Sequence, residues 1–168
     1  MEEAKKSKFE ESLESGTHRD LSKLIGNWTG SAKTWFEPGK LADESPVSGS
    51  VTSLLGGRFV LHQYKGSMMG KPLEGMAIIG YSFDKPGYQV AWVDSFHMST
   101  GILFSEAQPG ANGISVLGSY GGPELPVPWG WRTEIELVND NELVMTAYNI
   151  TPDGDASKAT EVVYKRVS

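Results

Sequence analysis

Three histidines are the side chains of this chain best suited to proton chemistry near neutral pH, and they are widely separated. They are His18, His62 and His97, in a chain without cysteine. Protein zinc sites usually combine histidines or cysteines at short, fixed spacings, so this scatter predicts no metal site. His18 lies where a short helix is expected to begin, and we predict a solvated side chain there.

His62 lies in the middle of an expected strand, on the face that also carries Arg58 and Tyr64. Because successive side chains of a strand point to opposite faces, the other face carries Phe59 and Leu61. This apolar pair slightly favours packing on its own side, with His62 on the outer surface. If the face of His62 points inward instead, the imidazole lines an interior space.

His97 follows Asp94 and Ser95 in an expected turn, and we predict an exposed loop side chain. The three residue types are those of a hydrolase triad, but neighbours on a strand cannot assemble one by proximity alone. The chain also lacks the Gly-x-Ser-x-Gly sequence of a nucleophile elbow and the lysine-containing loop that binds phosphates. Hydrolase and nucleotide-binding functions are therefore not indicated.

Polar and aromatic side chains in expected strands form the remaining candidate site. Buried charges need partners, so an arginine with a carboxylate in an apolar interior could hold the polar end of a ligand. The alternative for each residue is a place on the solvated surface. Met68, Met69 and Met76 could line the apolar part, because methionine adapts to irregular ligands. The candidate ligand-binding residues are Arg58, His62, Tyr64, Tyr81, Trp92, Asp94, His97, Phe104, Glu106 and Arg132.

About ten segments from residue 27 onward have the length and composition of β-strands, without helical segments between them. Turn signals separate them, such as Pro38-Gly39 and Pro109-Gly110, where glycine supplies the backbone angles of a tight reversal. This spacing is typical of an antiparallel meander. The expected strands lie near residues 27–36, 47–55, 58–65, 74–82, 88–95, 101–107, 113–119, 130–138, 142–150 and 158–167.

We expect these strands to close into a single all-β antiparallel barrel, because an open sheet of this size would expose two long edges. Trp131, Thr133 and Ile135 alternate with Arg132 and Glu134, as in a strand with one inner and one outer face. A two-sheet sandwich is the structural alternative. The mixed faces of other strands favour a barrel with a partly polar cavity.

The chain divides into a short N-terminal segment and one β domain. Residues 1–16 are charged and form either a helix or a flexible tail, and residues 17–168 form the barrel domain. A short helix is expected from Thr17, which with Asp20 resembles a capping box. Residues 120–129 contain three prolines, which cannot donate to a sheet ladder, so we expect a loop there, either a lid or a stiff connection.

The composition limits the classes of partner. The 168 residues are 39% hydrophobic and 21% charged, as in a folded globular domain. The formal net charge of -6 argues against nucleic acids and anionic membranes as partners. No apolar run has the length of a signal peptide or of a membrane-spanning helix, which predicts a cytoplasmic protein.

Several short motifs occur in the order found in one protein family. They are Leu-Ile-Gly-Asn-Trp-Thr-Gly at 24–30, Leu-Gly-Gly-Arg-Phe-Val at 55–60, Gly-Tyr at 80–81, Trp-Val-Asp-Ser at 92–95 and Tyr-Lys-Arg at 164–166. Together they resemble the DUF1579 family of bacterial proteins, which has no assigned activity. The resemblance extends over residues 21–166 and implies the calycin barrel of lipocalins and fatty-acid-binding proteins, with short helices near the N-terminus.

The resemblance also implies roles for particular residues. In calycins an arginine of the last strand packs over a tryptophan of the first strand and closes the barrel, and the matching residues here are Arg166 and Trp28. Residues 96–100 depart from the family's usual Asp-Ser-Met-Gly-Thr run, so the mouth of the pocket is expected to differ. Nitrobindin-like relatives bind haem through a histidine of a late strand, which this chain lacks; only His62 or His97 could substitute.

The favoured function is non-enzymatic binding of a small apolar or amphipathic molecule inside the barrel, with no cofactor. The main alternative is an isomerase or cyclase in which Asp94 or Glu106 acts as general acid or base, which requires a carboxyl group of raised pKa. Haem binding is a third reading, and a homodimer is left open.

Overall fold

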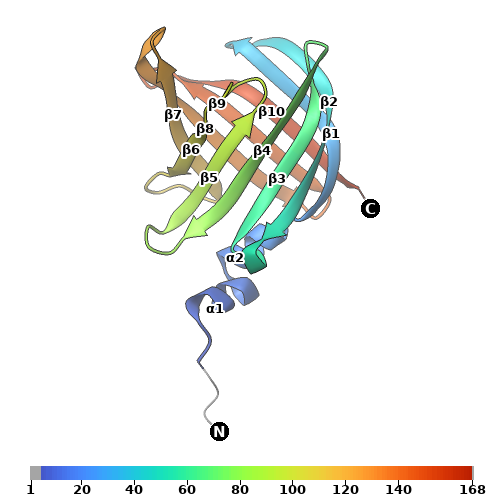
Figure 1. The fold of residues 1–168 in the computed structure, drawn as a ribbon, viewed down its shortest axis with the longest axis vertical. Helices are drawn as coiled ribbons and strands as arrows, with labels where there is room; N and C mark the ends of the chain where they lie inside the picture. The colour runs from blue at the N-terminus through green and yellow to red at the C-terminus, as the bar shows by residue number, and fades with distance from the viewer. Residues whose placement is uncertain (1–4, 168) are drawn as a thin grey trace.

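Ten antiparallel strands close into a barrel, with two short helices at one end, in the computed structural model of residues 5–167 (Figure 1). The expected fold class is thereby confirmed, and the sandwich is excluded. The elements are α1 (Lys8–Ser15), α2 (Thr17–Ser22), β1 (Gly26–Glu37), β2 (Lys40–Leu54), a 3-10 turn (Leu55–Gly57), β3 (Phe59–Met68), β4 (Lys71–Ser82), β5 (Gly87–Asp94), β6 (Leu103–Ala107), β7 (Ile114–Gly122), β8 (Leu125–Asn139), β9 (Glu142–Ile150) and β10 (Ala156–Val167).

Each strand pairs with the next one in the chain, and β1 closes the barrel by pairing with both β2 and β10. At the closure Trp28 stands opposite Arg166 on one side and Gly49 on the other. Closure gives every strand a neighbour on both sides over at least part of its length, which is the physical reason that many short strands favour a barrel.

The prediction of a loop at residues 120–129 is wrong, because β7 and β8 continue through these residues as a long hairpin. Tyr120 pairs with Trp129 and Gly122 with Leu125, while Pro126 and Pro128 lie within β8. Pairing of β8 with β9 begins only at Gly130. The prolines therefore lie on a part of β8 with a single neighbouring strand, where a missing N–H costs no ladder bond.

Residues 8–15 form helix α1, and α2 begins at Thr17 as expected, but the capping differs from the prediction. Helix α1 starts with a capping box in which the Ser7 hydroxyl accepts from the Glu10 N–H and the Glu10 carboxylate accepts from the Ser7 N–H. Helix α2 has Gly16 at its N-cap and no side-chain cap, so the capping box expected at Thr17 is wrong. In the described residues neither helix reaches the length and hydrophobicity needed to cross a membrane.

His18 is buried, which corrects the prediction of a solvated side chain. Its Nδ1 lies 2.8 Å from the Ser12 hydroxyl, and its ring packs against Phe9 and Phe83. The reason is that α1 and α2 fold back against the lower end of the barrel, so the start of α2 is enclosed instead of exposed (Figure 1).

The end of the barrel next to the helices is tightly packed. Leu21 of α2 and Trp28 and Tyr164 of the barrel are all buried to within 1% exposure. The Arg166 guanidinium lies 4.2 Å from the Trp28 ring centroid and donates to the carbonyl of Lys23, where α2 ends. One cation thus covers the indole and satisfies a carbonyl that the helix end leaves unpaired.

Candidate functional site

A hollow of about 110 Å³ lies inside the barrel, above this packed floor. Apolar and hydroxyl-bearing side chains form most of its wall, and no Asp, Glu, Lys or Arg is among the described residues that line it. The space remains open because several inward positions carry small side chains. These are Ala77 of β4, Thr133 of β8, Ala147 of β9 and Thr160 of β10.

Three polar rings meet at the bottom of the hollow. His62 Nε2 lies 3.1 Å from the Tyr164 hydroxyl, and the Tyr64 ring stacks on the imidazole with centroids 5.1 Å apart. His62 and Tyr164 come from β3 and β10 and meet across β1 and β2. Gly49 of β2 permits this, since a Cβ there would lie 2.7 Å from the Tyr164 hydroxyl and 3.1 Å from His62 Nε2.

The slight preference for an outward His62 is wrong. Its side chain is on the inner face with Val60 and is only 6% exposed. Burial lowers the pKa of His62 to about 4, so the imidazole is neutral at neutral pH. Burial likewise raises the pKa of Tyr64 and of Tyr164. All three groups are therefore uncharged and act through hydrogen bonds alone.

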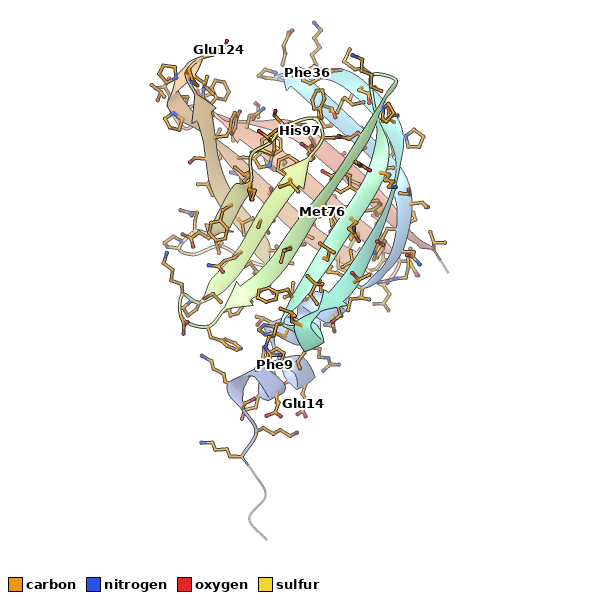
Figure 2. All side chains as sticks on the ribbon, in the orientation of Figure 1. Phe9, Glu14, Phe36, Met76, His97 and Glu124 are labelled. Atoms are coloured by element: carbon orange, nitrogen blue, oxygen red, sulfur yellow. The ribbon has the colours of Figure 1, made fainter. Side chains whose placement is uncertain are left out.

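Two stacked indoles cover the opposite end of the hollow. The Trp92 and Trp131 rings are 5.4 Å apart and nearly parallel, and the His97 ring packs against both, at 5.4 and 5.6 Å. Trp92 also donates its Nε1–H to the Tyr64 hydroxyl at 2.9 Å, which fixes the indole relative to the polar cluster below. This aromatic cover lies at the open end of the barrel, where Figure 2 labels His97.

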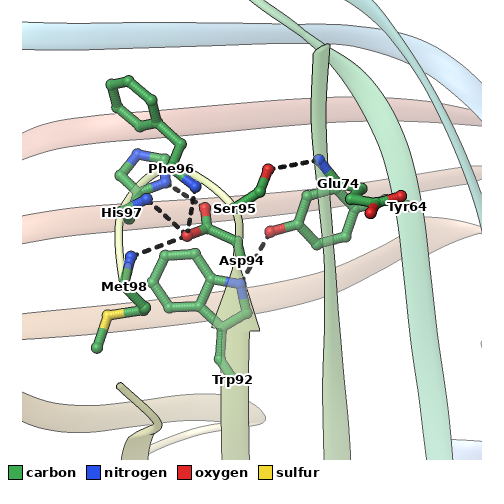
Figure 3. A network of polar contacts seen from close by, with 8 residues as sticks. All are labelled: Tyr64, Glu74, Trp92, Asp94, Ser95, Phe96, His97 and Met98. Carbon is green, nitrogen blue, oxygen red and sulfur yellow. Dashed lines mark hydrogen bonds and ion pairs between the residues drawn. The ribbon is translucent and has the colours of Figure 1, made fainter. Parts of the chain in front are cut away.

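The position of His97 is set by the buried carboxylate of Asp94 (Figure 3). Asp94 Oδ1 accepts from the backbone N–H groups of His97 and Met98 at 2.6 and 2.9 Å, and Oδ2 lies 2.5 Å from His97 Nδ1. His97 is thus half-buried, and the prediction of an exposed loop residue is wrong, because the residues that follow Ser95 curl back over the barrel mouth.

Asp94 remains ionised despite its burial. Burial favours a raised pKa of Asp94, but the His97 hydrogen bond and charge and the backbone N–H groups outweigh it, and the net pKa is lowered. A carboxyl group whose pKa is lowered and whose oxygens are both engaged holds a turn together. It does not offer a proton at neutral pH.

Three of the candidate residues lie on the outer face of the barrel wall. Phe104 is 53% exposed on β6. Glu106 pairs with Lys85 at 3.2 Å. Arg132 pairs with the next outward residue of β8, Glu134. The wall therefore separates all three from the hollow, and the arginine–carboxylate cluster expected inside the barrel does not form there.

Two further candidates lie at the helix end of the barrel. Arg58 stacks on the Phe9 ring of α1 at 4.4 Å and donates to the Leu55 carbonyl. Tyr81 packs edge-on against His18 and Tyr88. Of the ten candidates, the structure brings five together at the hollow and its cover: His62, Tyr64, Trp92, Asp94 and His97.

The sequence did not single out Trp131 and Tyr164 as members of this site. The alternation of its strand places Trp131 on the same face as Thr133 and Ile135. Once that face is assigned to the barrel interior, the pattern predicts that Trp131 points inward. Of the methionines considered for the lining, Met69 and Met76 are exposed, and the hollow is lined by Met145 instead.

A larger but shallow depression of about 590 Å³ lies against the outer face of β2 to β5. Gly49, Gly75 and Asp94 are among the residues that line it, and Tyr64 borders both this depression and the hollow. We place the candidate site in the hollow, because its wall surrounds a ligand on several sides and the depression leaves one exposed to solvent.

Comparisons with known proteins agree with the fold. A family model described as "Protein of unknown function (DUF1579)" matches residues 14–166. Among solved structures, an S-type phycobiliprotein lyase from Guillardia theta superimposes with a TM-score of 0.56 at 9% identity, covering 97% of this chain and 99% of that chain. At this identity the likeness is one of fold. No curated protein matches the chain significantly.

Proposed function

The chain belongs to the DUF1579 family, and from that membership and the barrel interior we propose that it binds a small apolar or amphipathic molecule in the hollow. The observation that carries the proposal is the hollow itself. Protein interiors are normally close-packed, and a void of this size reduces stability unless something occupies it. The tightly packed floor of the same barrel shows that the fold does not require a void.

The size of the hollow restricts the ligand. Its volume of about 110 Å³ is below the roughly 150 Å³ of an engineered apolar cavity that binds benzene, and well below the ~300–1,000 Å³ of pockets for drug-sized molecules. A compact molecule of about the size of one ring therefore fits better than a long acyl chain.

The solved structural neighbour is a lyase that acts, by its name, on phycobiliproteins. At 9% identity this likeness supports the barrel fold, and the proposed ligand class rests on the hollow itself.

Titration with toluene tests the proposal, followed by amide chemical shifts in solution. We expect saturable shifts confined to residues around the hollow. Ala147→Leu fills the hollow and should abolish them. Ala91→Leu is the matched control, because Ala91 pairs with Ile78 and Phe104 on the outer face, and it should leave binding unchanged. Shifts that survive Ala147→Leu, or no saturable binding, would contradict the proposal.

The enzymatic alternative gains no support from the geometry. Glu106 lies outside the barrel wall, and the pKa of Asp94 is lowered by the His97 contacts where a general acid needs it raised. Haem fits poorly as well. The hollow is too small for a porphyrin, and His62 Nε2 is already bonded to the Tyr164 hydroxyl.

Formation of a homodimer remains a separate prediction, independent of ligand binding in the hollow. On the outer face Ile78, Ala91 and Phe104 stand side by side in register, and Ile78 and Phe104 are about half exposed. Analytical ultracentrifugation at micromolar concentration tests it. A dimer that dissociates in Phe104→Ser would support this face as the interface, and a monomer throughout the concentration range would rule it out.

A further inference from the structure

One nitrogen at the bottom of the hollow lacks a partner within the protein. His62 Nε2 is bonded to Tyr164, and Nδ1 of the same ring has no hydrogen-bond partner in residues 5–167. In that part of the chain, no side-chain nitrogen or oxygen that is shut off from space is left unpaired. His62 Nδ1 therefore borders open space. The side chain is 6% exposed and lines the hollow, so that space is the hollow.

The pairing with Tyr164 leaves His62 Nδ1 able to act in either of two ways. If Nε2–H donates to the Tyr164 oxygen, Nδ1 carries a lone pair and accepts. If the Tyr164 hydroxyl donates to Nε2, Nδ1–H donates. A hydroxyl group on a ligand can complement both arrangements, because it both donates and accepts.

A second polar group points to the same chemistry. The Tyr64 oxygen accepts from Trp92 Nε1–H, but its own proton has no acceptor among the described residues. Tyr64 lines the hollow beside His62, with the two rings stacked. Acceptance from the indole polarises the Tyr64 O–H, which strengthens it as a donor.

The surroundings disfavour a charged ligand. A buried carboxylate needs a cation or several donors, and no Lys or Arg is among the described residues that line the hollow. A cation finds no free partner either, because no Asp or Glu is among the described residues that line the hollow. Both oxygens of Asp94, adjacent to the cover, already accept hydrogen bonds from His97 and the neighbouring backbone.

We propose that the hollow selects a compact, uncharged molecule that carries one hydroxyl group, and that His62 Nδ1 and the Tyr64 hydroxyl bind that group while the apolar wall and the Trp92–Trp131 pair enclose the remainder. This inference rests on the proposed function and specifies its ligand class. It also explains why a barrel interior that could be wholly apolar contains a polar cluster at its bottom.

Three matched probes test the inference: phenol, toluene and benzoate. Phenol is less hydrophobic than toluene, so a purely apolar cavity would bind phenol far more weakly. We expect phenol to bind at least as tightly as toluene, and benzoate to show no saturable binding at pH 7. In protein with ¹⁵N-labelled histidine, phenol should shift the His62 ring nitrogen signals and toluene should not.

Two variants separate the polar cluster from the rest of the wall. His62→Phe should weaken phenol about tenfold and change toluene by less than about twofold, because only phenol loses a hydrogen-bond partner. Tyr64→Phe removes one hydroxyl at nearly constant shape and should weaken phenol by a smaller factor in the same direction. It keeps the test valid if His62→Phe fails to fold.

The possible results are distinguishable. If neither phenol nor toluene binds, the hollow holds water only and the proposed function fails with the inference. If toluene binds but phenol is much weaker, or if Tyr64→Phe and His62→Phe leave the phenol-to-toluene ratio unchanged, the inference is overturned while small-molecule binding stands. Saturable binding of benzoate within the hollow would also overturn it.

Discussion

The two halves of the barrel use the same strands, but they are packed differently. The half next to the helices is closely packed, whereas the other half combines the hollow with a smaller buried cluster of Leu103, Trp131, Ala147 and Ala159. On β4 the inward residue is Ile79 near the floor and Ala77 one step above it. On β9 it is Leu143 near the floor and Ala147 higher up. The hollow therefore arises because the inward side chains of these strands change from large to small. It does not arise from an interruption of strand pairing.

The polar groups of the two ends of the hollow also differ in charge. At its bottom, His62 is buried beside the side chains of Tyr64 and Tyr164, and its pKa is lowered, so it is neutral. At its cover, Asp94 is buried beside His97 and backbone N–H groups, and it remains ionised. Burial disfavours charge in both places, and the number of donors directed at each group decides the outcome.

The largest effect is expected from removing a large side chain in the packed half of the barrel, because this makes the two halves more alike. Trp28→Ala removes an indole that is 1% exposed and the surface on which Arg166 stacks. We expect the free energy of unfolding to fall by about 3–5 kcal/mol, as measured by urea denaturation. Trp131→Ala, next to existing space, should cost less. An equal or larger loss in Trp131→Ala would show that the upper half is equally well packed.

Acidification should protonate the neutral His62 at the bottom of the hollow. Its folded pKa of about 4 lies below the ordinary value of 6.5, so the unfolded chain binds the proton first. Stability should therefore decrease as the pH falls from about 6.5 to 4, by about 3 kcal/mol from this group alone.

Urea unfolding at several pH values checks this prediction. His18, whose pKa is lowered by burial and by Arg58, acts in the same direction, and Asp94 adds a loss at still lower pH. The wild-type slope must therefore be compared with that of His62→Phe. A variant as steep as the wild type would mean that His62 does not titrate as its burial requires.

Closing the gap at Gly49 should disturb the cluster directly. In Gly49→Ala the new methyl group would overlap the Tyr164 hydroxyl, and we expect a loss of about 1–3 kcal/mol on unfolding. Gly122→Ala is the control, because a Cβ there meets nothing within 4 Å. Similar values for the two variants would refute the claim that Gly49 is needed for the approach of His62 to Tyr164.

The smallest effect is expected where the barrel has room. Ala147→Val places two methyl groups toward the hollow and should change the free energy of unfolding by less than about 1 kcal/mol, in either direction. Differential scanning calorimetry would detect it. A loss of several kcal/mol would indicate that the space around Ala147 is already filled.

The barrel could be predicted from the sequence because its signals are local. Turn residues mark the hairpins, and alternation assigns the faces of strands such as the one that contains Trp131 and Thr133. The inner face of β3 could not be assigned, since both of its faces mix polar and apolar residues. The position of His97 depends on a turn folded around Asp94, and the approach of His62 to Tyr164 depends on a gap in β2 far away in sequence. The first contact lies within one irregular turn and the second joins strands that are distant in sequence, and neither leaves a periodic pattern.

The guanidinium of Arg166 has a kinetic consequence. This side chain closes the base of the barrel against Trp28 and the end of α2. A ligand must therefore enter and leave at the other end, between Trp92, Trp131 and His97. The residence time of a guest would then be governed by how often those three rings part, even where its equilibrium affinity is modest.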